Sequence, residues 1–481
     1  MTINNTSDLN VKDLTFIKDI KSIAIIGTNE KRNFGFLRAH IKHFEGKVYA
    51  VNPIYSEIPG LKDIEVYPSL LDIPDNTIDY AYILVPAKIV LSVMDDCVEK
   101  GVKLVSIFTS DFSDSGTKEG IEREQELLRR AKNKVRILGP NGMGLFYPKL
   151  GISWTTIFPK THGNISFIGQ SGGLCFLTIL GAAGLGLKIS KAFSYGNGAD
   201  LDFVDILHFL INDDETDIIL GYVEGIKEGR GQDLKKVLDL NVNEKPIIIL
   251  KGGQTKAGSI ATKTHTASIS GENQIWKSLF DQYNIIQADS LEQLLSLALL
   301  IERYGYFKLD NAAVLSASGG YGVILTDIVE KVGINVPSFS PEIQKKLDSH
   351  FYLVGTSSKN PLDLAAIAFN SQNVINIMDV ALSDERIDGL ILDLPSYYFN
   401  ADIGFKYDPN MEENLVKTTT LGHMHNKPVI PIVLRLNCPI DKERIFTKIL
   451  DNNVPVFSDP LEVMPLLPKI SKYSKNRKSK N

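Results

Sequence analysis

The stretch "SIAIIGTNEKRNFG" (residues 22–35) joins a short apolar run to a turn that begins and ends with glycine. A continuous apolar run is typical of a parallel strand that is covered on both faces. α/β proteins bind phosphate where such a strand enters a glycine-rich turn and continues into a helix, because backbone N–H groups can then approach the anion. This stretch therefore predicts an α/β fold that opens with a strand, an anion-binding turn and a helix.

The same pattern recurs through the first 150 residues. Four further apolar runs are separated by amphipathic helical stretches: "VYAVNP" (48–53), "DYAYILVP" (79–86), "KLVSIFTS" (103–110) and "VRILGP" (135–140). Apolar strands that alternate with helices predict a doubly wound parallel sheet. We expect residues 1–150 to form one such domain.

Two more sets of strand-like runs follow. The second set includes "GNISFIG" (163–169), "DIILGYVEG" (217–225) and "KPIIILKGG" (245–253), and the third includes "AAVLSASGGYG" (312–322) and "GLILDLPS" (389–396). We therefore expect three consecutive parallel-sheet α/β domains, at residues 1–150, 151–307 and 308–468. The final residues, 469–481, are rich in lysine, and we expect a basic disordered tail there.

The composition limits the classes of function. The chain has 481 residues, of which 43% are hydrophobic and 23% charged, and a formal net charge of -5. This balance gives no basic surface for nucleic acid. Three widely separated cysteines form no disulfide framework or metal-binding pattern, and no apolar leader or membrane-length apolar run is present. We expect a cytoplasmic protein with no bound metal, no nucleic-acid partner and no membrane association.

Four strand ends carry glycine-rich turns: "IIGTNEKRNFG", "FIGQSGGLC", "LKGGQTKAG" and "SASGGYG". Together they favour a ligand with several phosphates or several anionic substrates. The first turn is not G-x-G-x-x-G, and the second strand closes with Asn52-Pro53, which disfavours NAD. The stretch "GGQTKAGS" lacks the G-K-[ST] of a P-loop, and "GQSGG" is not a G-x-S-x-G nucleophile elbow.

An ordered series of motifs carries a family resemblance. The series is "IIGTNEKRNFG", "VNP", "LVPA", "GPNGMG", "GQSGGL", "YGNGAD", "YVEGI", "HTASISG", "SGGYG" and "NPLDL". Over roughly residues 15–468 the chain resembles the α subunit of the nucleoside-diphosphate-forming acyl-CoA synthetases. This group includes the ADP-forming acetate–CoA ligases and is related to succinyl-CoA synthetase. The resemblance implies a Rossmann-like CoA-binding domain followed by two flavodoxin-like ligase domains.

The resemblance also implies a reaction, in which acyl-CoA, ADP and phosphate interconvert with acid, coenzyme A and ATP. An acyl phosphate forms first, a loop histidine then takes the phosphoryl group, and the loop swings to an ATP-grasp domain. His265 falls on the family's phosphohistidine, and Glu224 matches its orienting carboxylate. This pair suits the chemistry, because phosphorylation of an imidazole needs a neutral ring nitrogen and a group that orients the other nitrogen.

The family's binding residues can be placed on this sequence in two groups. For coenzyme A, the resemblance implies Gly27, Lys31, Arg32, Gly35, Asn52, Pro53, Val85 and Pro86. For phosphate or acid, the candidates are Asn141, Ser171, Gly172, Gly173, Thr266, Gly319 and Gly320. The serine–glycine and glycine–glycine pairs suit this role, because a helix start offers N–H donors to a phosphoryl group.

Several motifs depart from the family pattern. "GNGAD" has Gly198 where the family has lysine, "HTA" has Ala267 for glycine, and "GGYG" has Tyr321 for proline. The motif "GPNG" likewise stands where the family has GPNC or a close relative. No ATP-grasp region follows residue 468, so the resemblance implies a separate β subunit that binds ADP or ATP with Mg²⁺, in an α2β2 heterotetramer.

Two alternatives remain open at the level of sequence. The motifs that depart from the family pattern also fit a non-catalytic regulatory module of the same fold, which would bind coenzyme A or acyl-CoA. An NAD-dependent oxidoreductase would require an acidic residue where Asn52 stands.

Overall fold

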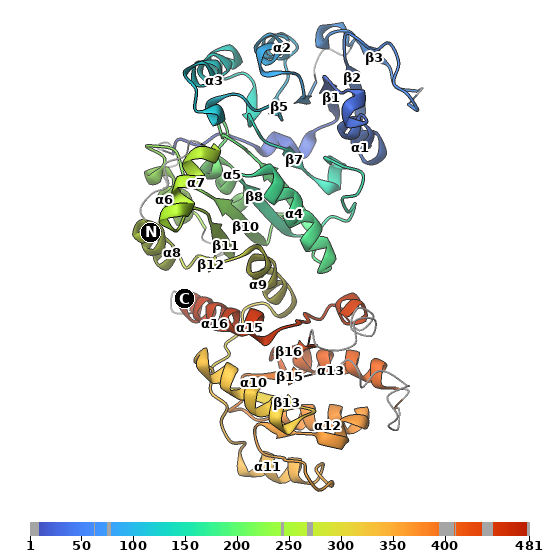
Figure 1. Cartoon of the computed structure of the whole chain (residues 1–481), viewed down its shortest axis with the longest axis vertical. Coiled ribbons are helices and arrows are strands. Elements are labelled where there is room, and N and C mark those ends of the chain that lie inside the picture. The colour runs from blue at the N-terminus through green and yellow to red at the C-terminus, as the bar shows by residue number, and fades with distance from the viewer. Residues whose placement is uncertain are drawn as a thin grey trace. The chain divides into compact units, whose positions relative to one another are not determined.

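A computed structural model describes residues 9–61, 63–74, 78–241, 245–266, 273–393, 408, 410–434 and 446–478. The chain divides into two compact units, Met1–Leu294 and Leu295–Asn481. The first unit contains two six-stranded sheets, and the described part of the second contains a four-stranded sheet (Figure 1). The prediction of successive parallel-sheet α/β domains is confirmed, and the first two sheets share one compact unit.

The first sheet is parallel throughout and has the order β3-β2-β1-β4-β5-β6. Its strands are β1 (Ser22–Ile26), β2 (Lys47–Val51), β3 (Val66–Tyr67), β4 (Tyr80–Ile83), β5 (Leu104–Ile107) and β6 (Arg136–Leu138). Every residue of β1 is buried, as the apolar run predicts. Ala24 and Ile26 pack in one core with the helices α2 and α3, and the alternate residues Ile23 and Ile25 are buried on the other face.

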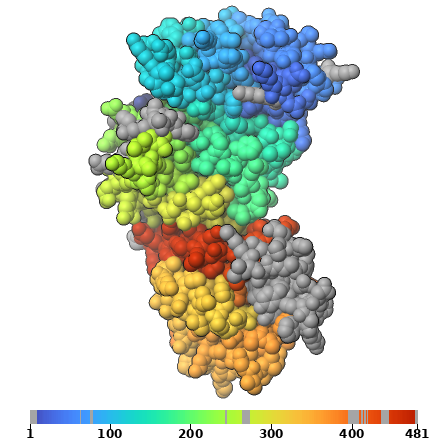
Figure 2. All heavy atoms as spheres, viewed as in Figure 1, coloured from blue at the N-terminus to red at the C-terminus, as the bar shows by residue number. Residues whose placement is uncertain are grey.

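Helices cover both faces of this sheet. They are α1 (Gly35–His43), α2 (Ala87–Glu99) and α3 (Lys118–Ala131), with 3₁₀ turns η2 (Thr15–Asp19), η3 (Glu30–Arg32), η4 (Leu70–Asp72), η5 (Ser113–Ser115) and η6 (Pro148–Leu150). In the space-filling view these segments form a continuous block of surface, coloured blue to cyan (Figure 2). Apolar strands buried on both faces explain why the sequence shows runs here and not alternation.

The second sheet has the order β12-β11-β10-β8-β9-β7. Its strands are β7 (Gly144–Phe146), β8 (Ile165–Gly169), β9 (Ile189–Ser194), β10 (Ile218–Val223), β11 (Ile247–Lys251) and β12 (Ile286–Ala288). The helices along this stretch are α4 (Gly172–Gly184), α5 (Phe203–Asn212), α6 (Gly231–Asp239), α7 (Lys256–Thr266), α8 (Asn273–Gln282) and α9 (Leu291–Tyr304). Without the edge strand β7, the order is that of a flavodoxin-like sheet.

The strand β7 departs from the predicted boundary at residue 150, because it pairs antiparallel with β9 in the second sheet. Its position is fixed from the first sheet, where the Tyr80 hydroxyl accepts from Leu145 N at 3.2 Å. The Tyr82 hydroxyl donates to Leu145 O at 3.0 Å. A Cβ on Gly144, whose φ is +83°, would lie 2.2 Å from Ser106 Oγ, so only glycine permits this approach. The second sheet therefore begins before residue 151.

The second unit contains the sheet β14-β13-β15-β16, which is parallel throughout. Its strands are β13 (Ala312–Ser316), β14 (Leu362–Asp363), β15 (Gly389–Asp393) and β16 (Val429–Ile432). Its helices are α10 (Gly319–Lys331), α11 (Pro341–Asp348), α12 (Ser371–Leu382), α13 (Met411–His425), α15 (Pro460–Val463) and α16 (Leu467–Lys478), with 3₁₀ turns η7 (Ala365–Phe369) and η10 (Met464–Leu466). This order again matches the flavodoxin-like prediction.

The prediction of a disordered tail at residues 469–481 is wrong for the part that the structure describes. Helix α16 runs from Leu467 to Lys478, and the last three residues lie outside the described ranges. Leu467, Ile470 and Tyr473 recur at helical spacing and are at most 4% exposed. The lysine-rich composition hid this buried stripe, because the charged side chains occupy the opposite face.

None of the helices in the described ranges is long and apolar enough to cross a membrane. The same residues contain no cluster of three His, Cys, Asp or Glu side chains that could hold a metal ion.

Candidate functional site

Each sheet reverses its strand order at one point, between β1 and β4, between β8 and β10, and between β13 and β15. Open α/β sheets bind ligands in the crevice outside the carboxyl ends of the strands at this reversal. The residues that follow these six strands are therefore the candidates for binding a ligand. Both reversals in the first unit have a cavity nearby.

A cavity of about 420 Å³ lies at the reversal of the first sheet, and we call it the first-sheet cavity. Five predicted CoA-binding residues line it, namely Gly27, Asn52, Pro53, Val85 and Pro86. A Cβ on Gly27 would lie 2.5 Å from Val85 Cγ1, so this turn needs glycine. Asn52 is buried and ties two loops together, since its Nδ2 donates to Thr28 O at 2.8 Å and its Oδ1 accepts from Ile54 N at 2.9 Å.

The remaining predicted CoA residues lie beside this cavity without lining it. Lys31 is exposed on the turn η3, and Gly35 is the first residue of α1. Arg32 belongs to the same turn, but its side chain lies outside the described atoms. Their roles in binding phosphate stay predictions.

Helix α4 begins directly at the reversal of the second sheet. Ser171 is its N-cap and accepts from Leu174 N at 3.4 Å, and Gly172 and Gly173 form the first turn. A Cβ on Gly172 would lie 2.9 Å from Met143 Cγ, whereas Gly173 has open space around it. The helix start therefore offers N–H groups at a strand end, as the sequence predicts for an anion site.

Glu224 follows β10 across the same reversal and is 2% exposed. The Tyr222 hydroxyl donates to its Oε1 at 3.0 Å, and its backbone N–H donates to Gln170 Oε1 at 3.0 Å. The Tyr195 hydroxyl donates to the same Gln170 oxygen at 3.3 Å. A buried carboxylate with fixed partners is what orientation of an imidazole requires.

Lys251, the last residue of β11, supports Glu224 from the next strand. It is 3% exposed, and its Nζ donates to Glu224 O at 2.7 Å and also to Gly252 O. The ammonium lies 5.4 Å from the centre of the Trp276 ring. Burial lowers the pKa of Lys251 from 10.5 to about 8. This lysine fixes the backbone that carries Glu224.

The predicted phosphohistidine lies on the helix that follows β11. His265 and Thr266 belong to the last turn of α7, and their side chains, with all of residues 267–272, lie outside the described atoms. The chain returns at Asn273, the first residue of α8. The roles of His265 and Thr266 therefore stay predictions.

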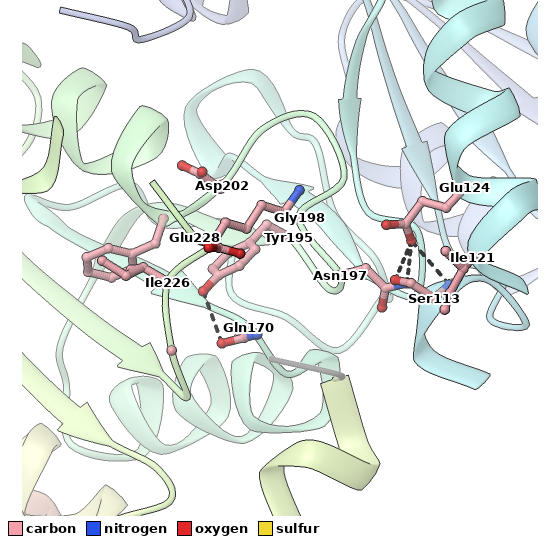
Figure 3. Close-up of a pocket in the computed structure, with 13 residues that line it drawn as sticks. Ser113, Ile121, Glu124, Gln170, Tyr195, Asn197, Gly198, Asp202, Ile226 and Glu228 are labelled. Carbon is pink, nitrogen blue, oxygen red and sulfur yellow. Dashed lines mark hydrogen bonds between the residues drawn. The ribbon is translucent and has the colours of Figure 1, made fainter. Parts of the chain in front are cut away.

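A second cavity, of about 290 Å³, lies at the reversal of the second sheet, and we call it the second-sheet cavity (Figure 3). It is lined by η5 and α3 of the first sheet, by the turn after β9 and by the segment after β10. Asn197 joins these parts, since its Nδ2 lies 2.9 Å from Glu124 Oε2 and 3.1 Å from Ser113 Oγ. Gln170 and Tyr195 also line it, so this cavity adjoins the residues that hold Glu224.

Asn141 lies in the segment between β6 and β7 and lines neither cavity. Its φ is +60°, and its backbone N–H donates to Thr109 O at 3.0 Å. Its predicted contact with the thioester or acid therefore stays a prediction.

In the second unit the reversal of the sheet lies between Ser316 and Asp393. The Ser316 hydroxyl donates to Asp393 Oδ2 at 2.8 Å. Asp393 is 2% exposed, and its Oδ1 is buried without a hydrogen-bond partner in the described structure. Burial raises the pKa of this carboxyl from 3.8 to about 6. Gly319 and Gly320 form the first turn of α10 beside it, as predicted, and their phosphate contact stays a prediction.

Two family models match the chain in the predicted order. Residues 21–148 match a CoA binding domain, and residues 162–301 match the "Succinyl-CoA ligase like flavodoxin domain". The second match contains Ser171, Glu224 and His265, which are the residues of the proposed phosphoryl site.

Relatives match almost the whole chain. It is 32% identical to acetate–CoA ligase (ADP-forming) I subunit α of Pyrococcus furiosus, over 95% of this chain and 96% of that subunit. The chain belongs to the ADP-forming acetate–CoA ligase family. A longer relative, the ADP-forming ligase I of Archaeoglobus fulgidus, is 30% identical over 95% of this chain, which spans only 63% of that enzyme. A solved acetyl-coenzyme A synthetase of Ca. Korarchaeum cryptofilum superposes with a TM-score of 0.82 at 30% identity, over 97% of this chain and 98% of that one.

Sequence reasoning about this member of the ADP-forming acetate–CoA ligase family missed four residues that hold its site. Tyr222 lies two positions before Glu224, on the same side of the strand end, and the period of two could have found it. Lys251 is a charge that closes the buried run "IIILK", which is also a visible signal. Gln170 and Asn197 act through contacts across 54 and 73 residues, which no local pattern reveals.

Proposed function

We propose that this chain is the α subunit of an ADP-forming acyl-CoA synthetase and carries the phosphoryl group on His265. The main observation is the arrangement of Glu224 and the start of α4 on either side of one strand reversal, with α7 ending at the proposed carrier. We place coenzyme A in the first-sheet cavity, because its walls combine a glycine turn with apolar and proline residues. We place the reaction in the cytoplasm, because the three cysteines form no disulfide pattern.

The reaction proceeds in two steps on this chain. A phosphate oxygen attacks the thioester carbon, the C–S bond breaks, and the departing thiolate takes a proton to give coenzyme A. The neutral imidazole of His265 then attacks the phosphorus of the acyl phosphate and releases the carboxylate. Glu224 accepts the hydrogen bond of the other ring nitrogen and stabilises the positive charge that develops on the ring. The N–H groups of Gly172 and Gly173 stabilise the phosphoryl oxygens.

We infer that transfer to ADP uses groups outside the three sheets described here. We propose a separate β subunit with an ATP-grasp domain that binds ADP or ATP with Mg²⁺, in an α2β2 assembly. The P. furiosus relative is named an α subunit and has nearly the same length as this chain, which supports a partner of this kind. The A. fulgidus relative is longer than this chain, and its additional length supports a function shared between two parts.

Intact mass after incubation with phosphate and a panel of acyl-CoA thioesters, starting with acetyl-CoA, tests the proposal. We expect one added phosphate that maps to His265 at neutral to alkaline pH and is absent from His265→Ala. Free coenzyme A and free acid should appear in equal amounts. Absence of phosphate with every thioester, despite measurable CoA binding, would instead favour a non-catalytic module that senses acyl-CoA. This second function is a candidate because Gly198 stands where the family pattern has lysine.

A further inference from the structure

Gly198 opens directly into the second-sheet cavity. It has a φ of +64°, and a Cβ built on it would lie 3.1 Å from Tyr195 Cδ2 and 3.6 Å from Asp202 Cβ. Tyr195 and Asp202 both line the cavity, as does Gly198 itself (Figure 3). Any side chain at position 198 would therefore leave the backbone between two wall residues. The glycine leaves that volume empty.

The cavity lies beside the residues that hold Glu224. It shares Gln170 with the hydrogen bonds that hold Glu224, and Gly225 in its wall is the next residue in the chain. Its opposite wall comes from η5 and α3 of the CoA-binding domain, through Ser113 and Glu124. A group attached to the coenzyme A thiol would therefore meet this space beside the proposed phosphoryl site.

The walls are apolar over part of their area. Phe203 is 4% exposed, and Ile226, Ile121 and the ring of Tyr195 complete the apolar lining. The volume, about 290 Å³, is close to the lower limit of small-molecule sites, about 300 Å³. Such a space suits an alkyl or aryl group of several carbon atoms.

The charged groups around the cavity disfavour a second carboxylate on the ligand. Glu124, Glu228 and Asp202 contribute three carboxylates to the lining, and Lys227 contributes one ammonium. Lys227 Nζ donates to Ala199 O at 2.9 Å, and burial lowers its pKa. Asp202 is paired with Arg230 at 2.8 Å, whereas the described hydrogen bonds to Glu124 come from neutral donors, namely the Ser113 backbone N–H, the Ser113 hydroxyl and the Asn197 amide. A negatively charged tail would be repelled by this carboxylate at short range.

We propose that the second-sheet cavity binds the acyl group of the thioester and selects an uncharged acyl group larger than acetyl. Gly198 sets the size of this pocket, and the surrounding carboxylates exclude dicarboxylic acids. The inference rests on the proposed function, since it names the acid on which the same site acts.

Binding of thioesters to the full chain without phosphate tests the proposal apart from catalysis. Isothermal titration would compare coenzyme A with its acetyl, 3-methylbutanoyl, phenylacetyl and succinyl thioesters. Each buried methylene should tighten binding about fourfold. We therefore expect at least a tenfold preference for 3-methylbutanoyl-CoA and phenylacetyl-CoA over acetyl-CoA, with succinyl-CoA weaker than the uncharged thioesters. Equal affinity for all the thioesters, or tightest binding of acetyl-CoA or succinyl-CoA, would overturn the proposal.

The variant Gly198→Lys tests whether the preference for larger thioesters arises in the second-sheet cavity. It should lower the ratio of phenylacetyl-CoA to acetyl-CoA affinity at least fivefold, because the lysine fills the pocket. Gly305→Lys is the matched control, since Gly305 has a φ of +66° and no atom within 4 Å of its Cβ position, and it should leave the ratio unchanged. An equal loss of affinity for every thioester and for coenzyme A itself would show that the cavity holds the pantetheine arm, and would overturn the proposal.

The outcomes separate this inference from the proposed function. A size preference without phosphohistidine would support the pocket and contradict catalysis. Phosphohistidine that forms equally well from acetyl-CoA and phenylacetyl-CoA, without a size preference in binding, would support catalysis and contradict the pocket.

Discussion

The strand reversals of the second and third sheets share a plan and differ in how their acidic residue is held. In both, a serine precedes two glycines at the start of a helix, at Ser171 in α4 and at Ser318 in α10. Glu224, at the second sheet, accepts from the Tyr222 hydroxyl and is fixed through its backbone by Gln170 and Lys251.

At the third sheet, Asp393 accepts only from Ser316 within the described structure, and its second carboxylate oxygen is buried without a partner. A buried acceptor without a partner has a desolvation cost that no hydrogen bond offsets. Two sheets with similar helix starts therefore differ in their acidic residue. Glu224 is held by hydrogen bonds, whereas Asp393 carries a desolvation cost that lowers stability.

The largest expected effect is at the pre-organised acid. Glu224→Gln should lower the rate of phosphohistidine formation at least about 100-fold, because the amide cannot stabilise the positive charge on the imidazole. Rapid-quench labelling with phosphate and acyl-CoA would measure the rate. The control is Glu122→Gln, whose carboxylate is 61% exposed on α3. If Glu224→Gln forms phosphohistidine within threefold of the wild-type rate, Glu224 has no role in the reaction.

The acid in the third sheet should affect stability, with a sign that depends on pH. The folded pKa of Asp393 is raised from 3.8 to about 6, so the folded state binds this proton more tightly. Stability is then lost as pH rises from about 4 to about 6, and the full cost, about 3 kcal/mol, is present at neutral pH. Asp393→Asn should therefore stabilise the second unit by about 2 kcal/mol at pH 7.5 and change little at pH 4.

Hydrogen exchange of the β13 amides during urea unfolding, at pH 7.5 and at pH 4, would measure this difference in the free energy of unfolding. Asp327→Asn, on the exposed surface of α10, is the control. Equal effects of Asp393→Asn at both pH values would show that the carboxyl has its ordinary pKa and would weaken the contrast with Glu224.

The hydroxyl that holds Glu224 should have a smaller effect. Tyr222→Phe removes a hydrogen bond to a charged group and should slow phosphohistidine formation about tenfold. Tyr283→Phe removes a matched hydroxyl, which donates to Asp239 Oδ1 at 2.9 Å, and should leave the rate unchanged. In the Glu224→Gln background, Tyr222→Phe should have little further effect. A full tenfold loss there would mean that the tyrosine acts independently of Glu224.

The smallest effect compares the two serines directly. Ser171 accepts from Leu174 N, whereas Ser318 makes no side-chain capping hydrogen bond. Ser171→Ala should lower the free energy of unfolding by about 1 kcal/mol, and Ser318→Ala by much less. Urea titrations of the two variants would measure the difference, and equal losses would contradict the assigned caps.

Much of the fold could be predicted because it depends on local patterns. The five buried residues of β1 and the glycine at position 27 follow from an apolar run and a turn that only glycine permits. The contacts around Glu224 could not be predicted in full, because Gln170 reaches Glu224 across 54 residues and no local pattern reveals this contact. The C-terminal helix is hidden for another reason, because its lysine-rich composition obscures the helical spacing of Leu467, Ile470 and Tyr473.

The short strand β7 has a consequence for how this gene could be divided. A break at residue 162, where the flavodoxin-like match begins, would remove β7 and leave the backbone edge of β9 open to pairing with a second chain. Moving the break to residue 143 would keep β7 on β9 but deprive Tyr80 and Tyr82 of their hydrogen-bond partner Leu145. Neither position yields two independent halves. A division between Leu294 and Leu295, where the two compact units separate, would instead leave both sets of contacts intact.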